Sequence, residues 1–360
     1  MVAVASFFAE SYAEARQKFL DAVGRSGAVL IDSHRNPTLG PDGGALFTDV
    51  ARIGPANAKK LLVLNSATHG IEGYCGSGCQ VGWLLKGHYH RDAQPDTAVI
   101  LVHAINPHGF AWGRRVTEEN VDLNRNFLDH GKPHPQNADY EVLAEHINPI
   151  AWTPESLAKA DAAIARHYGL PNADFLPSAV HGGQYVNAKG TFYGGDAPTW
   201  ANRIFRAILA GHCSGAAAIG LIDYHTGLGP LGHGDLRFRG RRHLDLARSW
   251  YDEVSTVPGA GATWHVPSGL LALALDESLA QRTTVPMVIE YGTYDVNSVL
   301  KAIRADNWLH CHGDLASPQG REIKAFMREM FYPSVPEWKI MVFSRSNDVI
   351  RQALVGLAKT

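Results

Sequence analysis

The sequence is short of cysteine, of long hydrophobic runs and of excess charge of either sign. Its 360 residues include only four cysteines, too few and too scattered to form a disulfide framework. No stretch approaches the roughly 20 apolar residues of a membrane-spanning helix. Lys and Arg together number 33 and Asp and Glu 35, so the charge points to neither nucleic acid nor an anionic membrane as a partner. We therefore expect a globular protein of the reducing cytoplasm.

The length and the absence of a linker favour one domain. A chain of 360 residues allows one large α/β domain or two ordinary ones, and it can bury a substantial core. No internal repeat, low-complexity tract or sharp change in composition marks a boundary. Residues 1–26 lack the features of a signal peptide and show apolar residues at helical spacing instead. We predict a single domain over residues 1–360, with a docked N-terminal helix within 1–26 and an irregular insertion over 129–200.

Four apolar runs, each followed by a polar turn, predict the centre of the fold. They cover residues 61–64, 98–104, 216–224 and 286–290, and their unbroken apolarity is typical of parallel strands covered on both faces. Residues 27–33 and 45–53 have strand character and suit the edge of the same sheet. The expected fold class is therefore α/β, with a mixed, mainly parallel twisted sheet flanked by helices.

The turns after these runs carry residues that can bind a metal. His69 and Glu72 share a tight turn, and catalytic zinc sites use three N or O ligands and leave one position to water. Each signal is weak alone, since about one H-x-x-E is expected by chance in such a chain. A lone histidine such as His225 is more often a hydrogen-bonded core residue, and Glu290 alone would more often pair with an arginine. However, the turns after parallel strands meet at one edge of a sheet, so their combination favours a ligand site.

Five motifs in this chain order resemble the zinc metallocarboxypeptidases, also called funnelins. They are THGIEG at 68–73, NPHGF at 106–110, an arginine at 115 followed by VDLNRNF at 121–127, DYHTG at 223–227 and EYGT at 290–293. The flanks and the 129–200 stretch look closer to a poorly characterised bacterial branch than to secreted digestive enzymes. The resemblance implies the carboxypeptidase fold, one Zn2+ per chain and a rim position for the 129–200 insertion.

The resemblance also implies the residues of the metal centre. It assigns zinc to His69, Glu72 and His225, a set that leaves an open position for water. Glu290 matches the general base, which takes a proton from the attacking water and passes it to the leaving amine. Asp122 matches the carboxylate that fixes the tautomer of a zinc-binding histidine.

A second group of residues matches the substrate-binding part of the family. Arg115 matches the arginine that stabilises the tetrahedral oxyanion, and the adjacent Arg114 is an alternative for that role and a further candidate for substrate binding. Asn124 and Arg125 match the pair that binds the terminal carboxylate of the substrate. The family's mobile tyrosine has no aligned counterpart, so Tyr251, Tyr185 and Tyr193 remain candidates.

Three functions follow from the resemblance. The first is a metallocarboxypeptidase that cleaves a C-terminal peptide or peptide-like amide bond. The second is an N-acyl-amino-acid amidase of the aspartoacylase type, whose catalytic glutamate is usually followed by a β-rich domain; the chain after Thr293 has a helical pattern, which favours the first. The third is a non-catalytic binding module, but such forms lose a ligand or the base, and none is missing here. Either enzyme takes a peptide or acyl amino acid with a free carboxylate, while side-chain preference and oligomeric state stay open.

Overall fold

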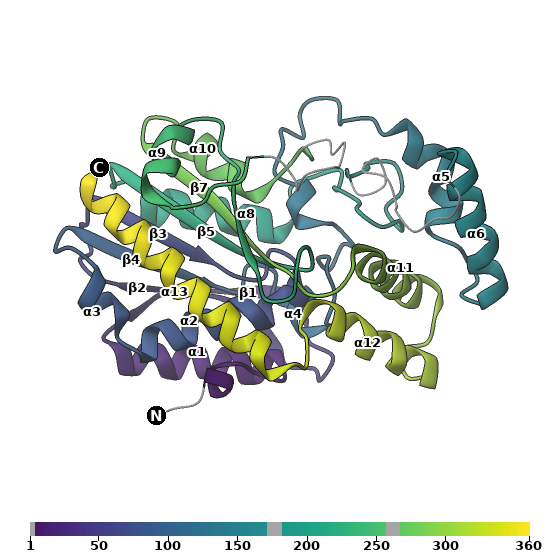
Figure 1. The fold of residues 1–360 in the computed structure, drawn as a ribbon, viewed down its shortest axis with the longest axis horizontal. Helices are drawn as coiled ribbons and strands as arrows, with labels where there is room; N and C mark the ends of the chain where they lie inside the picture. The colour runs from purple at the N-terminus through teal and green to yellow at the C-terminus, as the bar shows by residue number, and fades with distance from the viewer. Residues whose placement is uncertain (1–3, 171–181, 257–266) are drawn as a thin grey trace.

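A computed structural model describes residues 4–170, 182–256 and 267–360. Seven strands form one twisted sheet in the order β1-β2-β4-β3-β5-β7-β6 (Figure 1). The strands are β1 (Val29–Leu39), β2 (Ala45–Ile53), β3 (Lys60–Asn65), β4 (Thr97–His103), β5 (Ala218–Thr226), β6 (Gly234–Phe238) and β7 (Thr283–Tyr291).

The four strands at the centre of the sheet run parallel. They are β4, β3, β5 and β7, the same four that the apolar runs predict, whereas β1, β2 and β6 pair antiparallel at the two edges. The predicted fold class is confirmed. Because the parallel strands point the same way, the turns that follow them meet at one edge of the sheet.

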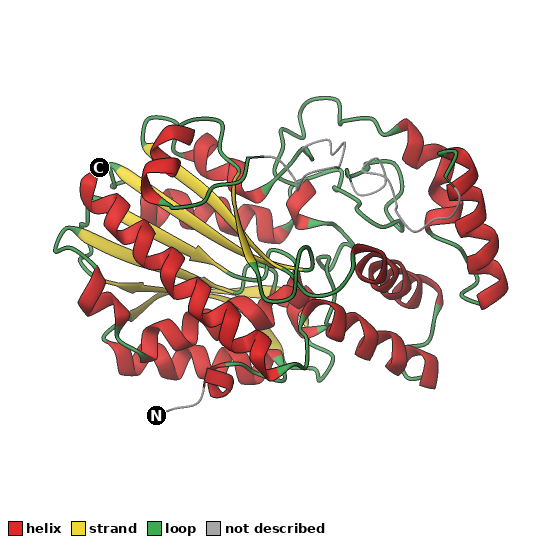
Figure 2. Cartoon of the chain, viewed as in Figure 1, coloured by secondary structure: helices red, strands yellow, loops and turns green. Residues whose placement is uncertain are grey.

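Helices cover both faces of the sheet (Figure 2). The longer ones are α1 (Tyr12–Ser26), α2 (Gly73–Leu85), α5 (Ala138–Ile147), α6 (Pro154–His167), α8 (Trp200–Ile208), α9 (Leu244–Trp250), α10 (Leu271–Ser278), α11 (Val296–His312), α12 (Pro318–Phe331) and α13 (Pro336–Lys359). Shorter turns are η1 (Val4–Phe7), η2 (Gly70–Glu72), α3 (His88–Asp92), α4 (Pro107–Ala111), η3 (Leu123–Arg125) and the π-helix η4 (Leu209–Cys213).

The core has two layers, one on each side of the sheet. Leu62 and Leu64 of β3 belong to the layer shared with α1, α2 and α13, and Leu61 and Val63 belong to the layer shared with α8 and α10. Successive side chains of a strand point to opposite faces, so a strand covered on both sides is apolar at every position. This explains why the central strands show no polar alternation.

The structure of the C-terminal part differs from what the sequence pattern indicates. We expect a polar tail after residue 331, but residues 336–359 form α13, which lies across one face of the sheet (Figure 1). Trp338, Val342, Val349, Leu354 and Leu357 of this helix are buried. The expectation was wrong because apolar residues at helical spacing are separated here by many charged and polar ones.

A group of helices stands beside the sheet, at the right in Figure 1. α11 packs against α12 and α5 against α6, and Arg304 of α11 donates a hydrogen bond to the Ile147 carbonyl at the end of α5 (2.9 Å). α6 lies where the sequence predicts a helix, within 154–168, while α5 was not expected.

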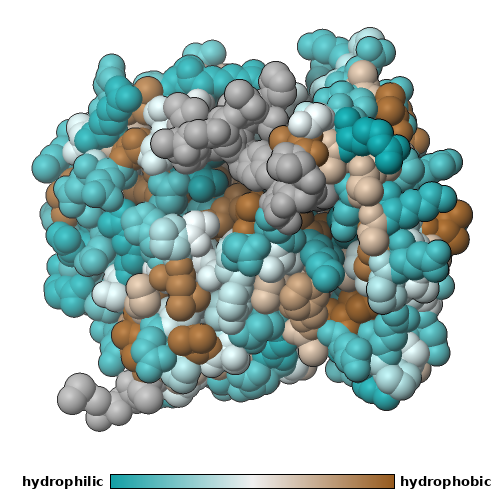
Figure 3. Space-filling model, turned by 45° about the vertical axis from the view of Figure 1, so that its right-hand side comes forward, coloured by the Kyte–Doolittle hydropathy of each residue, from teal (hydrophilic) through white to brown (hydrophobic). Residues whose placement is uncertain are grey.

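The molecular surface is mostly hydrophilic on the face in Figure 3, and its hydrophobic residues form small separate groups. Among the described residues, no helix is both long enough and apolar enough to cross a membrane.

Candidate metal centre

The carboxyl ends of β5 and β7 and the turn after β3 border a cavity of about 430 Å³. Its lining combines charged residues with an apolar wall from α11. The lining residues are His69, Glu72, Arg115, Asn124, Arg125, Phe192, His225, Thr226, Gly227, Leu228, Gly229, Arg237, Arg239, Pro267, Leu270, Val288, Glu290, Val296, Val299, Leu300, Ile303 and Phe331.

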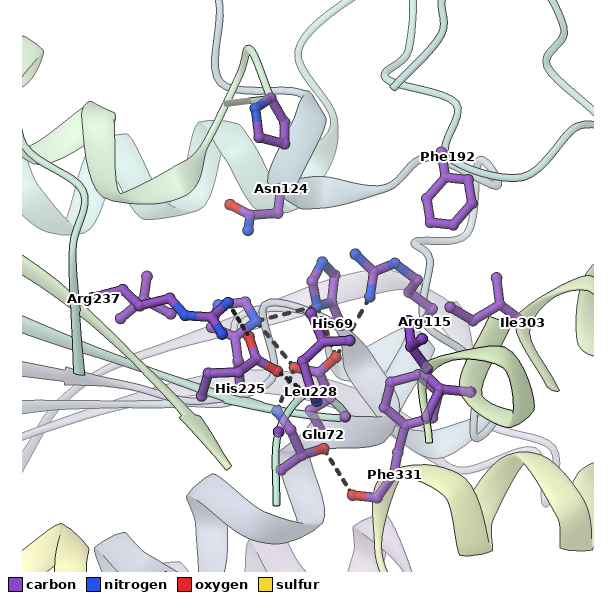
Figure 4. Close-up of a pocket in the computed structure, with 18 of the residues that line it drawn as sticks. His69, Glu72, Arg115, Asn124, Phe192, His225, Leu228, Arg237, Ile303 and Phe331 are labelled. Atoms are coloured by element: carbon purple, nitrogen blue, oxygen red, sulfur yellow. Dashed lines mark hydrogen bonds and ion pairs between the residues drawn. The ribbon is translucent and has the colours of Figure 1, made fainter. Parts of the chain in front are cut away.

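Three buried side chains at the floor of the cavity converge on one point (Figure 4). His69 Nδ1 lies 2.8 Å from Glu72 Oε1, and His225 Nδ1 lies 3.0 Å from Glu72 Oε2. The ligand atoms of these three residues all lie within 4.8 Å of one another. Two imidazole nitrogens and a carboxylate are donors that zinc prefers, and three protein ligands are typical of catalytic zinc.

The turn that carries His69 and Glu72 is held by its backbone. Gly70 N donates to the Arg115 carbonyl (3.1 Å) and Ile71 N to the Arg114 carbonyl (2.8 Å). A Cβ added at Gly70 would lie 2.0 Å from the backbone of Gly109, so only glycine allows this approach. The THGIEG and NPHGF motifs therefore pack directly on each other.

Two further carboxylates orient the histidines from behind. His69 Nε2 lies 3.2 Å from Asp122 Oδ1, and His225 Nε2 lies 2.7 Å from Asp223 Oδ2. Asp223 also accepts hydrogen bonds from Asn65 (2.8 Å) and Thr68 (2.7 Å). Such partners hold the other ring nitrogen, Nδ1, toward the metal. The position of Asp122 agrees with the role that the resemblance implies. The sequence analysis did not predict such a role for Asp223. Its only signal was its position two residues before His225 on the same strand.

The electrostatics of this group favour a cation. Burial raises the pKa of Glu72, but His69 and His225 outweigh it and lower that pKa to about 2. Burial lowers the pKa of His225, but Asp223 and Glu72 outweigh it and hold the pKa well above the usual value. Carboxylates that keep a proton on a buried imidazole provide the negative field that a divalent ion needs. The residues present therefore fit a bound zinc ion.

Glu290 lies beside this group at the end of β7. Its Oε1 accepts from Leu228 N (3.3 Å), and its Oε2 lies 3.7 Å from Arg237 Nη1. Burial raises the pKa of Glu290, while the charge of Arg237 opposes that rise. A carboxylate with a raised pKa at the edge of a cavity is suited to proton transfer.

The two adjacent arginines point to different places. Arg115 lines the cavity, donates from Nε to Asp122 Oδ2 (3.0 Å) and places Nη1 3.6 Å from Glu72 Oε1. Arg114 is buried in an ion pair with Asp306 of α11 (3.1 Å), which also accepts from Lys324. Of the two candidates, only Arg115 lines the cavity.

Asn124 and Arg125 also border the cavity, on η3. Asn124 Oδ1 accepts from Leu271 N (2.9 Å), so its amide nitrogen faces His69 and its neighbours from above in Figure 4. Gly269 has a φ of +75°, and a Cβ there would lie 2.2 Å from the Arg125 carbonyl oxygen. The segment before α10 thereby supports both residues.

No tyrosine lines the cavity within the described ranges. Tyr251 is buried in the core, and the Tyr185 hydroxyl donates to the Arg125 carbonyl (2.7 Å). Phe192, in the segment 182–198, lines the cavity. Gln184 and Thr191 of the same segment are buried.

Two arginines at the end of β6 were missed. Arg237 lies in this edge strand, Arg239 directly follows its last residue, and both line the cavity. Their only signal was the alternation in GDLRFRG, where polar residues recur at every second position.

Residues 8–345 match the family described as "Protein of unknown function (DUF2817)". The chain belongs to this family. No curated protein matches it.

Solved structures relate the DUF2817 fold to that of carboxypeptidases. Thrombin activatable fibrinolysis inhibitor matches with a TM-score of 0.52 and 10% identity, over 97% of this chain and 74% of that one. A metallo-carboxypeptidase from Pseudomonas aeruginosa matches with a TM-score of 0.45 and 13% identity, over 95% and 71%. Carboxypeptidase A from Helicoverpa armigera matches with a TM-score of 0.46 and 12% identity, over 94% and 73%. The match to thrombin activatable fibrinolysis inhibitor, whose TM-score is above 0.5, shows that the two chains share a fold.

Proposed function

We propose that this DUF2817 chain is a zinc-dependent hydrolase, and specifically a metallocarboxypeptidase that removes C-terminal residues from peptides or peptide-like compounds. The observation that carries the proposal is the convergence of His69, Glu72 and His225 on one point, with Glu290 and Arg115 on the same cavity. One zinc ion per chain is held by the first three residues. A cytoplasmic location belongs to the same proposal and is supported by the four free cysteines.

Each residue has a role that follows from its surroundings. When bound, zinc supplies a Lewis acid for water activation and carbonyl polarisation. Glu290 takes the proton of the attacking water and returns it to the leaving amine. Arg115, anchored by Asp122, donates to the oxyanion that develops on the carbonyl, a contribution of about 3 kcal/mol for such a donor. Asp122 and Asp223 keep the histidine rings in place.

Asn124 and Arg125 select the substrate's carboxylate. A guanidinium beside an amide nitrogen is a planar array of donors that can meet both oxygens of a carboxylate. Arg125 is buried, so a bound carboxylate also offsets its desolvation. A free carboxylate bound there positions the amide bond next to it against the metal centre.

The alternative is an N-acyl-amino-acid amidase, whose substrate also carries a carboxylate. Enzymes of that type usually follow the catalytic glutamate with a β-rich domain, and the described part of this chain after Thr293 contains α11, α12 and α13 and no strand. This supports the carboxypeptidase.

The test is hydrolysis by the zinc-loaded protein of free-acid peptides, their C-terminal amides and N-acyl amino acids. We expect the free acids to be cleaved, with the amides at least about 10²-fold slower, because blocking the carboxylate leaves Arg125 without its anion. Chelation should stop the reaction and added zinc restore it. Equal turnover of acids and amides would remove Arg125 from this role, and cleavage of acyl amino acids alone would favour the amidase.

A further inference from the structure

The cavity has two walls of opposite character. Val296, Val299 and Ile303 of α11 form an apolar wall, whereas Arg237 of β6 and Arg239, which directly follows that strand, form a cationic wall near Glu290. Figure 4 shows Arg237 and Arg115 on opposite sides of the metal ligands. A substrate that spans the metal centre therefore has one half against the apolar wall and the other half against the cationic wall.

Of the two arginines in the cationic wall, only Arg237 has ion-pair partners among the described residues. Its Nε donates to Asp235 Oδ2 (2.7 Å), and its Nη1 lies 3.7 Å from Glu290. Arg239 follows the last residue of β6, two positions after Arg237, and lines the same cavity. Within the described ranges it forms no ion pair, and its side chain donates only to the Phe238 carbonyl (3.4 Å). Residues 257–266 contain no Asp or Glu.

A half-buried guanidinium without an ion-pair partner is energetically unfavourable unless it binds an anion. Burial lowers the pKa of Arg239 and the neighbouring charge of Arg237 lowers it further, while Glu290 and Asp235 oppose this change. Burial and the charge of Arg237 disfavour the cation, and a bound carboxylate would compensate for both. The planar fork of arginine is suited to take such a carboxylate through two hydrogen bonds.

The same short helix contacts Asn124 and the segment that follows Arg239. Leu271, the first residue of α10, donates to Asn124, and Asp276 of α10 accepts from the backbone of Arg241 (2.7 Å). Arg239, Asn124 and Arg125 line one cavity of about 430 Å³. Two carboxylates of one small molecule bound there can therefore meet the two guanidiniums.

We propose that Arg239, assisted by Arg237, forms a second anion subsite, and that the residue released by the enzyme is an acidic amino acid. Its α-carboxylate binds Asn124 and Arg125, and its side-chain carboxylate binds Arg239. The subsite lies beside Glu290, the group that protonates the leaving amine, so it serves the leaving half of the substrate. The apolar wall then faces the acyl half. The predicted release of an acidic amino acid rests on the proposed function, whereas the predicted binding of that amino acid to the subsite does not.

The first arm of the test is hydrolysis. Peptides and N-acyl amino acids ending in Glu or Asp are compared with those ending in Gln, Asn or Leu. We expect kcat/KM for Glu to exceed that for Gln by about 10²-fold, because Gln leaves the guanidinium without its anion. Arg239→Gln should abolish this preference by lowering only the turnover of acidic substrates. Arg239→Lys should retain part of it, and Arg248→Gln, at an exposed arginine, should change nothing.

The second arm is binding, measured by calorimetry on the zinc-loaded protein with L-glutamate, L-glutamine and L-leucine. We expect glutamate to bind at least about 10-fold more tightly than glutamine, and Arg239→Gln to remove the difference. Binding of glutamate without hydrolysis of any substrate would overturn the proposed function and retain the subsite. Hydrolysis without a distinction between Glu and Gln, or equal binding of the two amino acids, would overturn the subsite. Thermal unfolding of each variant shows whether its fold is intact.

Discussion

His69 Nδ1 and His225 Nδ1 lie 3.2 Å apart, and the Glu72 carboxylate lies within 3.0 Å of both. Each imidazole has its opposite nitrogen on an aspartate, Asp122 for His69 and Asp223 for His225. Both rings are therefore fixed with the same atom toward one point. A pair of histidines held this way has little freedom to lose when a metal binds, which favours affinity.

The metal content of the protein should depend on these histidines. We expect about one zinc per chain in the purified protein and a loss of it in His69→Ala and in His225→Ala, because two protein ligands bind zinc far more weakly than three. Elemental analysis after dialysis checks this. His312→Ala, at an exposed histidine, is the control and should keep its zinc. An undiminished zinc content in both His69→Ala and His225→Ala would contradict the site.

Asp223→Asn should weaken zinc binding without abolishing it. The amide is nearly isosteric but carries no charge, so it supports His225 less well, and a loss of about 10- to 100-fold in affinity is expected. Competition with a chromogenic chelator measures the constant. Excess zinc should restore activity, and Asp245→Asn, on the surface, should bind as the wild type does. An unchanged constant would show that Asp223 does not support the ligand.

Glu290→Gln should separate catalysis from binding. The variant retains the shape of the side chain but cannot accept a proton, so kcat should fall by at least about 10²-fold with a small change in KM. Steady-state kinetics and zinc analysis of the same sample check both parts. Activity within a few-fold of the wild type would assign the base to another group.

The adjacent arginines should differ in their effect on catalysis. Arg115→Gln should lower kcat/KM by about 10²-fold because its guanidinium lines the cavity, and it should also lower stability because it removes a cation from the buried carboxylate of Asp122. Arg114→Gln should cost about 2 kcal/mol of stability, since it removes one cation from the buried carboxylate of Asp306, and it should leave KM unchanged. Kinetics and chemical denaturation distinguish the two. The reverse pattern would exchange their roles.

The buried His103 should make stability depend on pH. Burial lowers its pKa to about 4 from an ordinary value of 6.5. The unfolded chain therefore binds more protons than the folded one between these values, and stability falls as the pH falls from about 6.5 to 4. The full shift corresponds to about 3 kcal/mol. Chemical denaturation of the wild type, His103→Gln and His312→Gln across this pH range measures the free energy of unfolding. Only His103→Gln should reduce the dependence of this free energy on pH.

The sequence alone predicted the centre of the fold and a group of candidate metal ligands. Unbroken apolar runs identify β3, β4, β5 and β7, because strands covered on both faces need apolar residues at every position. The turns after them must meet at one edge, which predicts a ligand site there, and the family resemblance assigns His69, Glu72 and His225 to it. These features depend on local pattern, one topological rule and the resemblance.

The tertiary structure decided what depends on pairs of distant residues. Whether Arg114 or Arg115 faces the cavity is settled by the partner that each one meets, and Asp306 lies on α11, far along the chain. Arg239 directly follows β6, and the antiparallel pairing of that strand with β7 brings it to the cavity. The alternation in GDLRFRG indicates a short strand, but it does not show which residues its arginines meet, because that depends on the strand's neighbours in three dimensions.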